Sequence, residues 1–369
     1  MITDFSLRYH YRPQKGWMND PNGLVFFDGW YHAFYQHAPS HEAPWGEPMV
    51  WGHARTKDFL HWEELPVALW ADMPYDADGC WSGTAAVKDG VLYLFYASVR
   101  KEGGGEGVWM GQSVSMASST DGIHFEKHPL NPLIPSYPAD GCRDFRDPAV
   151  LVEGEDAYLV MASGNQEKTE ARLLLYKSRD MVHWSYEGIL ARWENAVICE
   201  CPSFLKFGEK YLLTASVCTE TGHFFSVLCG DFDGHTFTPE ITELIQKGPD
   251  QYAGQAFSAP DGRALLITWI PGWSYSNFAE KSLGCLSLPV EFLLSDGHIR
   301  AWPIREVEQL LTDSAEGLER TESGFVLHRE AREDVVYTGP IRDLKVLRDN
   351  YITEVYLNGG ESIYVAVNC

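Results

Sequence analysis

Three acidic residues occupy corresponding places in copies of a segment that recurs along the chain. Asp20, Asp147 and Glu200 each precede a turn by seven or eight residues, and in the second copy the matching residue is Ser82. If the copies fold alike, the three carboxyl groups meet in one pocket. Carboxylates that share a pocket repel one another and acquire different pKa values, which suits one for nucleophilic attack and another for proton transfer. A single acid would be a turn cap, whereas three in phase favour a catalytic site.

The residues near these acids would adjust their ionisation. We expect donors such as Asn19, Asn22 and backbone amides to surround Asp20 and keep it ionised. We expect the thiols of the two cysteines on either side of Glu200 to form a weakly polar wall that raises the pKa of Glu200. A raised pKa would let Glu200 carry a proton near neutral pH.

Aromatic residues suited to sugars lie close to the same repeats. Aromatic faces stack on sugar rings, although we expect most of the 13 tryptophans to pack between strands. The tryptophans near the repeat ends are Trp45, Trp51, Trp81, Trp269 and Trp273. No Cys/His group has the spacing of metal ligands, and no Gly-x-Ser-x-Gly segment is present. We therefore expect neither a metal nor a cofactor, and no serine hydrolase.

The recurring segment is a turn followed by an aromatic or aliphatic strand. Its five copies start, at a mean spacing of about 58 residues, at Asp28, Asp89, Gly154, Gly208 and Asp261. A second signature, an Asp followed four residues later by an aromatic, is interleaved with the first at Asp58, Asp121, Asp180 and Asp233. In its first three copies a Ser or Thr comes two residues before the Asp, which predicts hairpin turns capped by the Asp side chain. A sandwich of ordinary hairpins would not keep two signatures in register, so the pattern predicts a five-bladed β-propeller.

Both signatures stop after about residue 295. We predict a five-bladed β-propeller catalytic domain over 1–298, a linker with a short helix over 299–320, and a shortened β-sandwich-like segment over 321–369. Helical spacing of apolar residues places the helix within Arg305–Thr312, and Ile352–Leu357 with Ser362–Val367 form the clearest hairpin. The predicted fold class is all-β, a propeller with a short C-terminal β-rich appendage.

The charge balance excludes several classes of partner. The chain has 29 Lys and Arg against 52 Asp and Glu, a formal charge of −23. Nucleic acids and anionic membranes are bound by clustered basic residues, so neither is an expected partner. No apolar run is long enough to cross a membrane, and the N-terminus does not resemble a secretory signal. Eight irregularly spaced cysteines indicate thiols in a cytoplasmic protein.

The sequence resembles glycoside hydrolase family 32, which contains invertases, inulinases, levanases and sucrose-6-phosphate hydrolases. The similarity runs from about residue 8 to residue 300, and an ordered set of motifs is far more specific than any one tripeptide. The motifs that carry it are Trp17-Met18-Asn19-Asp20-Pro21-Asn22-Gly23, Trp51-Gly52-His53, Gly79-Cys80-Trp81-Ser82-Gly83, Phe145-Arg146-Asp147-Pro148 and Glu200-Cys201-Pro202. Asp349–Glu361 is similar to a late part of the family's C-terminal β-sandwich, although the tail here is much shorter.

The resemblance implies a role for each matching residue. Asp20 corresponds to the nucleophile, Glu200 to the general acid/base, and Asp147, with Arg146, to the group that binds fructose hydroxyls. The positions that match the pocket around a terminal fructosyl ring are Asn19, Gln36, Trp45, Trp51, Trp81, Ser82, Arg146 and Trp269. The implied activity is that of a retaining, exo-acting β-fructofuranosidase, with a small β-fructofuranoside as its partner.

Other functions stay open at this stage. Sucrose-6-phosphate hydrolase, inulin or levan exohydrolase and fructosyltransferase share the same motifs, and five-bladed glycosidases also act on arabinans and xylans. A non-catalytic sugar-binding propeller is disfavoured because all three carboxylates and Arg146 are present. The acidic balance disfavours a phosphorylated substrate, and the sequence sets no oligomeric state.

Overall fold

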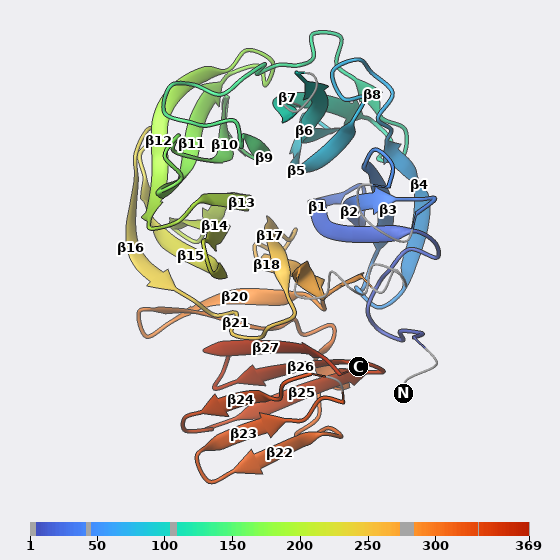
Figure 1. Ribbon diagram of the computed structural model, residues 1–369, viewed down its shortest axis with the longest axis vertical. Coiled ribbons are helices and arrows are strands. Elements are labelled where there is room, and N and C mark those ends of the chain that lie inside the picture. The colour runs from blue at the N-terminus through green and yellow to red at the C-terminus, as the bar shows by residue number, and fades with distance from the viewer. Residues whose placement is uncertain (1–4, 42–45, 104–108, 274–283, 331, 369) are drawn as a thin grey trace.

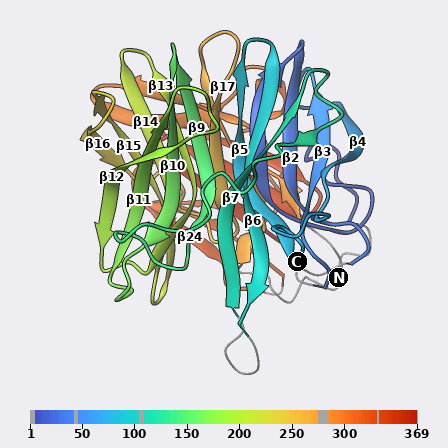
Figure 2. The same ribbon diagram turned by 90° about the horizontal axis from the view of Figure 1, so that it is seen from above.

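The computed structural model describes residues 5–41, 46–103, 109–273, 284–330 and 332–368. Five antiparallel sheets stand around a central channel, and two smaller sheets lie beside the fifth (Figure 1). These five sheets are the blades of the predicted five-bladed β-propeller. In each blade the strands follow one another outward from the channel, and Figure 2 shows the innermost strands side by side.

The blades have the following strands. The first contains β1 (Trp17–Phe27), β2 (Trp30–Ala38), β3 (Val50–Thr56) and β4 (Trp62–Leu69). The second contains β5 (Gly79–Lys88), β6 (Val91–Glu102), β7 (Trp109–Ser119) and β8 (Glu126–Lys127). The third contains β9 (Arg146–Glu153), β10 (Asp156–Gly164), β11 (Glu170–Ser178) and β12 (Ser185–Glu194). The fourth contains β13 (Ile198–Phe207), β14 (Lys210–Thr219), β15 (Gly222–Phe232) and β16 (Phe237–Glu243). The fifth contains β17 (Tyr252–Ser258), β18 (Ala264–Ile270), β19 (Cys285–Leu286), β20 (Val290–Ser295) and β21 (His298–Pro303).

The two repeated signatures are turns within the blades. The first is the hairpin between the two innermost strands. The second is the turn after the third strand, where the Asp58 carboxylate accepts hydrogen bonds from the amides of Leu60 and His61 at 2.9 and 2.8 Å. Thr56 Oγ1 accepts from the amide of Phe59 at 3.0 Å, and the turns at Asp121 and Asp180 repeat the pattern. The predicted side-chain caps are confirmed.

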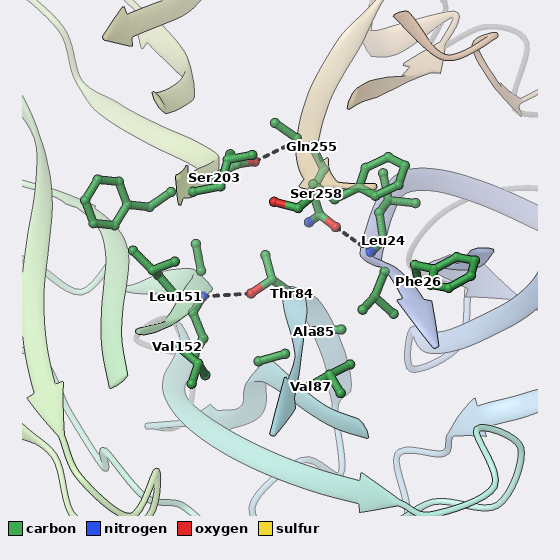
Figure 3. A pocket seen from close by; sticks show the side chains of 18 residues that line it. Leu24, Phe26, Thr84, Ala85, Val87, Leu151, Val152, Ser203, Gln255 and Ser258 are labelled. Carbon is green, nitrogen blue, oxygen red and sulfur yellow. Dashed lines mark hydrogen bonds between the residues drawn. The ribbon is translucent and has the colours of Figure 1, made fainter. Parts of the chain in front are cut away.

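Polar side chains join neighbouring blades across the middle of the channel. The Gln255 amide donates to the carbonyl of Gly83 at 2.9 Å and accepts from the amide of Leu24 at 3.0 Å, which ties blade five to blades one and two. Thr84 and Ser203 make similar links between other blades. Beyond this layer lies a cavity of about 270 Å³ with mainly aliphatic walls, shown in Figure 3. The layer separates that cavity from the carboxylates, which lie at the opposite ends of the same strands.

The chain beyond blade five forms two three-stranded sheets. The first contains β22 (Leu318–Thr321), β23 (Gly324–Leu327) and β24 (Val335–Thr338). The second contains β25 (Leu344–Asp349), β26 (Ile352–Leu357) and β27 (Ser362–Val367), so the predicted hairpin is present with the predicted bounds. The connection holds a 3₁₀ turn at Glu308–Leu310, within the range of the expected helix, and Thr312 after it pairs with Val346 of the second sheet. No helix among the described residues is long and apolar enough to cross a membrane.

The second small sheet is covered on both faces. Val346 and Val355 pack with Phe325 of the first small sheet, which gives a two-sheet sandwich. Ile352 and Tyr356 pack with the core of blade five. The sandwich is therefore continuous with the propeller through buried apolar contacts, and the division into domains at residues 298 and 320 stays a prediction.

A buried ionic cluster fastens the N-terminal segment to the C-terminal sheets. The His10 ring contacts Asp349 Oδ2 at 2.8 Å and Glu354 Oε1 at 3.3 Å, and all three residues are buried. Asp349 also accepts from the amides of Arg8, Tyr9 and His10. Burial by itself lowers the pKa of His10, but the two carboxylates raise it to about 9. The ring is therefore protonated at neutral pH. Its contacts hold the N-terminal segment against the second small sheet.

We predict that this cluster makes stability depend on pH on the alkaline side. The folded pKa of about 9 exceeds the ordinary 6.5, so the stabilisation is complete below pH 6.5 and is lost as the pH rises toward 9. The free energy of unfolding, measured with urea, should fall over this range by an amount on the order of 3 kcal/mol. His10→Gln should be less stable at pH 6.5 and should lose this slope. His124→Gln, at an exposed turn, should keep it, and an unchanged slope in His10→Gln would contradict the assignment.

Candidate active site

Each innermost strand carries a β-bulge at the same level of the channel. The pairing with the second strand shifts by one residue after Met18, Trp81, Arg146, Glu200 and Tyr252. A bulge adds one residue and changes the direction of the side chains around it. Asp147, Cys201 and Ala253, which lie in three of these bulges, have positive φ angles of 59°, 48° and 52°. Because of the bulges, consecutive side chains can face the channel, where a regular strand would present only every second one.

The bulges arrange the pocket residues in two rings. The first ring consists of Asn19, within the bulge of β1, and of the residues after which the pairing shifts in the other four innermost strands, Trp81, Arg146, Glu200 and Tyr252. The second ring consists of the residues that follow them, Asp20, Ser82, Asp147, Cys201 and Ala253. Most of these side chains line a cavity of about 180 Å³ at the mouth of the channel, together with Gln36 and Trp273.

The predicted correspondence of the three acids is wrong for Glu200. Asp147 and Cys201 each lie seven residues before the glycine of their turn, and both have positive φ. Cys201 is therefore the counterpart of Asp147, and Glu200 is the counterpart of Arg146. The three carboxylates still meet in one cavity, but Glu200 belongs to a different ring from Asp20 and Asp147.

The second ring holds two carboxylates around one thiol. Cys201 Sγ lies 3.5 Å from Asp20 Oδ2 and 3.6 Å from Asp147 Oδ2, and the Cys201 amide donates to Asp147 at 2.8 Å. Ser82 Oγ donates to Asp20 Oδ2 at 2.7 Å, and Asn19 Nδ2 donates to its Oδ1 at 3.1 Å. The expected donor Asn22 does not take part, because its amide oxygen faces the side chain and amide of Gln36 instead.

The first ring holds the third carboxylate between a cation and a phenol. Arg146 donates to Glu200 Oε1 through Nε at 3.0 Å and Nη2 at 2.7 Å, and its Nη1 donates to Asp144 at 2.9 Å. The Tyr252 hydroxyl donates to Glu200 Oε2 and lies 3.1 Å from Cys218 Sγ. Glu200 thus has both oxygens engaged by donors.

The two rings shift the pKa values of the carboxyl groups in opposite directions. Burial, with the charge of Glu200, raises the pKa of Asp20 despite the hydrogen bonds from Ser82 and Asn19. Burial and the two neighbouring carboxylates raise the pKa of Asp147 to about 7, although Arg146 opposes this. Burial also acts to raise the pKa of Glu200, but the charge of Arg146 and the hydrogen bonds from Tyr252 and Arg146 outweigh it and lower that pKa.

The expected thiol wall that would raise the pKa of Glu200 is therefore contradicted. Cys199 points away from the pocket and contacts the carbonyl oxygens of Ser163 and Arg172, while Cys201 faces the other two acids. The thiol near Glu200 is Cys218, from the next strand, at 3.8 Å. Cys199 precedes the bulge, where side chains alternate between the two faces, so it lies on the face opposite to Glu200. Cys201 follows the shift and faces the channel, but its thiol is next to Asp20 and Asp147.

Most of the predicted sugar-binding residues line the cavity. Asn19, Gln36, Trp81, Ser82 and Arg146 do so together with the three acids. Trp51 and Trp269 do not, since both are fully buried. The indole of Trp51 donates to the carbonyl of Trp81, and Trp269 packs edge-on against Trp17 and Trp273. These two tryptophans support the pocket wall instead of contacting a ligand. Trp45 lies outside the described residues.

Two residues of the site could not be singled out from the sequence. Tyr252 begins β17, outside the motifs that carry the family resemblance, and Cys218 lies near the end of β14, well past the turn at Gly208 that marks this copy of the repeat. Trp273, noted as an aromatic near a repeat, lines the cavity and is partly exposed. Tyr252 occupies the same place in its strand as Arg146 and Glu200, directly before a pairing shift. That shared place in the repeat is the signal that could have identified it.

The comparisons with known proteins agree with this geometry. The family model for the glycosyl hydrolases family 32 N-terminal domain matches residues 10–303, most of the chain. The chain belongs to glycoside hydrolase family 32. It is a glycoside hydrolase, and its substrate is a carbohydrate.

Relatives of this family 32 chain include enzymes of different substrates. A sucrose-6-phosphate hydrolase of Zymomonas mobilis is 34% identical over 95% of this chain and 71% of that protein. A raffinose invertase of Escherichia coli is 36% identical over 82% of this chain and 65% of that protein. A Bombyx mori family 32 β-fructofuranosidase has the same fold, with a TM-score of 0.83 at 24% identity over 98% of this chain and 89% of that one.

We predict that Ser82 holds down the pKa of Asp20. Ser82→Ala removes a hydrogen bond to the ionised carboxylate and should raise that pKa by about one unit. The measurement is a ¹³C NMR titration of side-chain carboxyl carbons, with Asp20→Asn used to assign the signal. Ser258→Ala, on β17 at the opposite end of the channel, is the matched control and should leave the titration unchanged. An unshifted Asp20 in the Ser82 variant would show that the hydrogen bond does not act on its charge.

Proposed function

We propose that this family 32 enzyme is a retaining, exo-acting β-fructofuranosidase that releases fructose from sucrose or short fructo-oligosaccharides. The observation that carries the proposal is the division of three carboxylates between two rings with opposite electrostatics. Two acids of different environment beside one bond are what double displacement at a sugar requires.

In the proposed first step, Asp20 attacks the anomeric carbon of the fructosyl unit. The bond from that carbon to the leaving oxygen breaks, and Glu200 gives the oxygen its proton. The product is a fructosyl ester on Asp20. Asn19 and Ser82 hold the attacking carboxylate in place through their hydrogen bonds.

In the second step, water replaces the departed alcohol. Glu200, now ionised, takes a proton from the water, whose oxygen attacks the same carbon and frees Asp20. Two inversions retain the configuration, and the two carboxyl groups must lie ~5–5.5 Å apart for the residue that attacks to reach the carbon directly. Asp147 and Arg146 are proposed to bind hydroxyl groups of the fructosyl ring.

The proton needed for the first step is shared within the cluster. In the empty pocket Asp147 retains a proton up to a pH of about 7, whereas Arg146 and Tyr252 favour ionised Glu200. Hydroxyl groups donated by a bound sugar would lower the pKa of Asp147 and free that proton for Glu200. The upper limb of the pH profile then belongs to the coupled pair and not to either residue alone.

The shape and charge of the cavity support a short, uncharged substrate. The cavity shares no lining residue with the cavity of about 270 Å³ that Gln255, Thr84 and Ser203 line farther along the channel, which supports binding of a chain end. Among the described lining residues Arg146 supplies the positive charge, and its guanidinium is already bound by Glu200 and Asp144. Sucrose 6-phosphate is the second candidate, favoured by the sucrose-6-phosphate hydrolase of Zymomonas mobilis. The cytoplasmic location remains a proposal.

A substrate panel tests the proposed function. Purified enzyme should release fructose from sucrose and short fructo-oligosaccharides with a higher kcat/KM than from sucrose 6-phosphate, inulin or levan. Asp20→Asn should abolish every one of these activities, because no other group can form the ester. A higher kcat/KM for sucrose 6-phosphate would transfer the assignment to the second candidate. If the products are fructosyl oligomers instead of free fructose, the enzyme is a fructosyltransferase.

The role of Glu200 is tested with two classes of leaving group. Glu200→Gln should slow hydrolysis of sucrose by ~10²–10⁴-fold but should largely spare formation of the ester from an aryl fructoside with an acidic leaving group. On that aryl fructoside the wild-type upper limb near pH 7 should disappear in the variant. Glu209→Gln, in the turn between β13 and β14, is the control. It should keep both the wild-type rate on sucrose and the upper limb on the aryl fructoside. Equal losses on the two substrates would identify another residue as the acid.

A further inference from the structure

A six-residue segment, 245–250, joins blade four to blade five by way of the C-terminal sheets. We call it the strap. The Ile363 amide donates to the carbonyl of Ile245 at 2.8 Å, and the Lys247 amide donates to the carbonyl of Ile363 at 2.9 Å. Gln246 pairs with Ile363 as a parallel bridge. The strap therefore runs along the edge of β27 before the chain enters the propeller again.

The end of the strap is fixed by a buried ion pair. Asp250 Oδ2 accepts from Arg329 Nη1 at 2.8 Å and from the Val367 amide at 2.9 Å. The Asp250 and Arg329 side chains are only 1% and 7% exposed. Arg329 lies between β23 and β24 and is held in turn by the carbonyl of Glu333 at 2.6 Å. Breaking a buried pair leaves an uncompensated charge, so the strap ends at a well-defined place.

Two residues after Asp250 the chain reaches the carboxylate of Glu200. Tyr252 is 4% exposed, its ring meets the His223 ring edge-on with centroids 4.6 Å apart, and its hydroxyl donates to Glu200. Gly272 allows this fit, because a Cβ there would lie 3.0 Å from Tyr252 Cβ. The ring of Tyr252 is thus packed against His223 and its Cβ against Gly272, so the direction of its hydroxyl depends on the position of the backbone that follows the strap.

We propose that the C-terminal sheets position the acid/base carboxylate, with Arg329 and Asp250 as positioning residues that act on Glu200 through Tyr252. The proposal rests on the proposed role of Glu200 as the acid. It gives the sandwich a part in the reaction in addition to its apolar packing against blade five.

Tyr252 is one of several groups that set the ionisation of Glu200, and its contribution to the pKa of Glu200 has a definite sign. Its hydrogen bond favours the ionised carboxylate, so its loss should raise the pKa of Glu200. The other titratable or charged groups around this pair are Arg146, Asp144 and Asp147 on the β9 side, Asp20 on β1, Cys199 and Cys201 on β13, Cys218 on β14 and His223 on β15. His223 is hydrogen-bonded to the backbone of Gln251, the residue after the strap, so it can shift together with Tyr252 when Arg329 is changed. The hydrogen bonds of Arg146 and Asp147 do not involve the strap.

The test is a double-mutant cycle on the pH profile of kcat/KM. Tyr252→Phe and Arg329→Gln should each move the upper limb to higher pH, by about half a unit to one unit. The double variant should move it no further than Tyr252→Phe alone. Arg329→Lys, which keeps a charge near Asp250, should restore part of the wild-type profile. If Arg329→Gln does not fold, Asp250→Asn removes the other partner of the ion pair, and its upper limb should move to higher pH in the same way.

Val346→Ala is the matched control for lost stability. Val346 is fully buried in the core of the small sandwich and makes no hydrogen bond to Asp250 or Arg329, so its variant should have a lower Tm and an unshifted limb. A limb that moves in Tyr252→Phe but not in Arg329→Gln or Asp250→Asn would overturn the proposal, as would additive shifts in the double variant. A limb that survives in Glu200→Gln would instead refute the role of Glu200, which distinguishes the two failures.

Discussion

The β-bulge in each innermost strand is the constraint on which the whole site depends. A regular strand turns successive side chains to opposite faces, so it could present either Arg146 or Asp147 to the channel but not both. The bulges in all five strands remove that restriction at one level of the propeller. The cost is a left-handed backbone at Asp147, Cys201 and Ala253, a conformation that costs energy in residues with side chains. The pocket is thus built from strained backbone held by the hydrogen bonding of five regular blades.

The two rings created by these bulges divide the electrostatic work. Arg146 is placed beside Glu200 and away from Asp20, so one carboxylate is stabilised in its charged form while the deeper two compete for a proton. A cation placed symmetrically among all three acids would have left them alike. The difference comes from a single residue step along β9 and β13, and in the proposed mechanism it separates the attacking group from the proton carrier.

The propeller is closed by parts of the chain that lie far apart in sequence. His10 joins the N-terminal segment to Asp349 and Glu354 of the second small sheet, and that sheet packs on blade five. The same sheet receives the strap that leads to Tyr252. The small sandwich therefore contacts both the N-terminal segment and the strap that precedes Tyr252.

The sequence by itself determined the repeated architecture and the identity of the acids. The turn residues, the Asp caps such as Asp58 and the aromatic or aliphatic strands that follow the turns are local signals, and they predicted five blades and the C-terminal hairpin. The motifs around Asp20, Asp147 and Glu200 identified the family. Tertiary structure alone decided how these groups act on one another. A bulge moves Glu200 into a different ring from Asp20, and contacts across the fold bring Arg146 and Tyr252 to its two oxygens. Ionisation depends on distance and burial in three dimensions, so the direction of the Glu200 pKa could not be read from its neighbours in the chain.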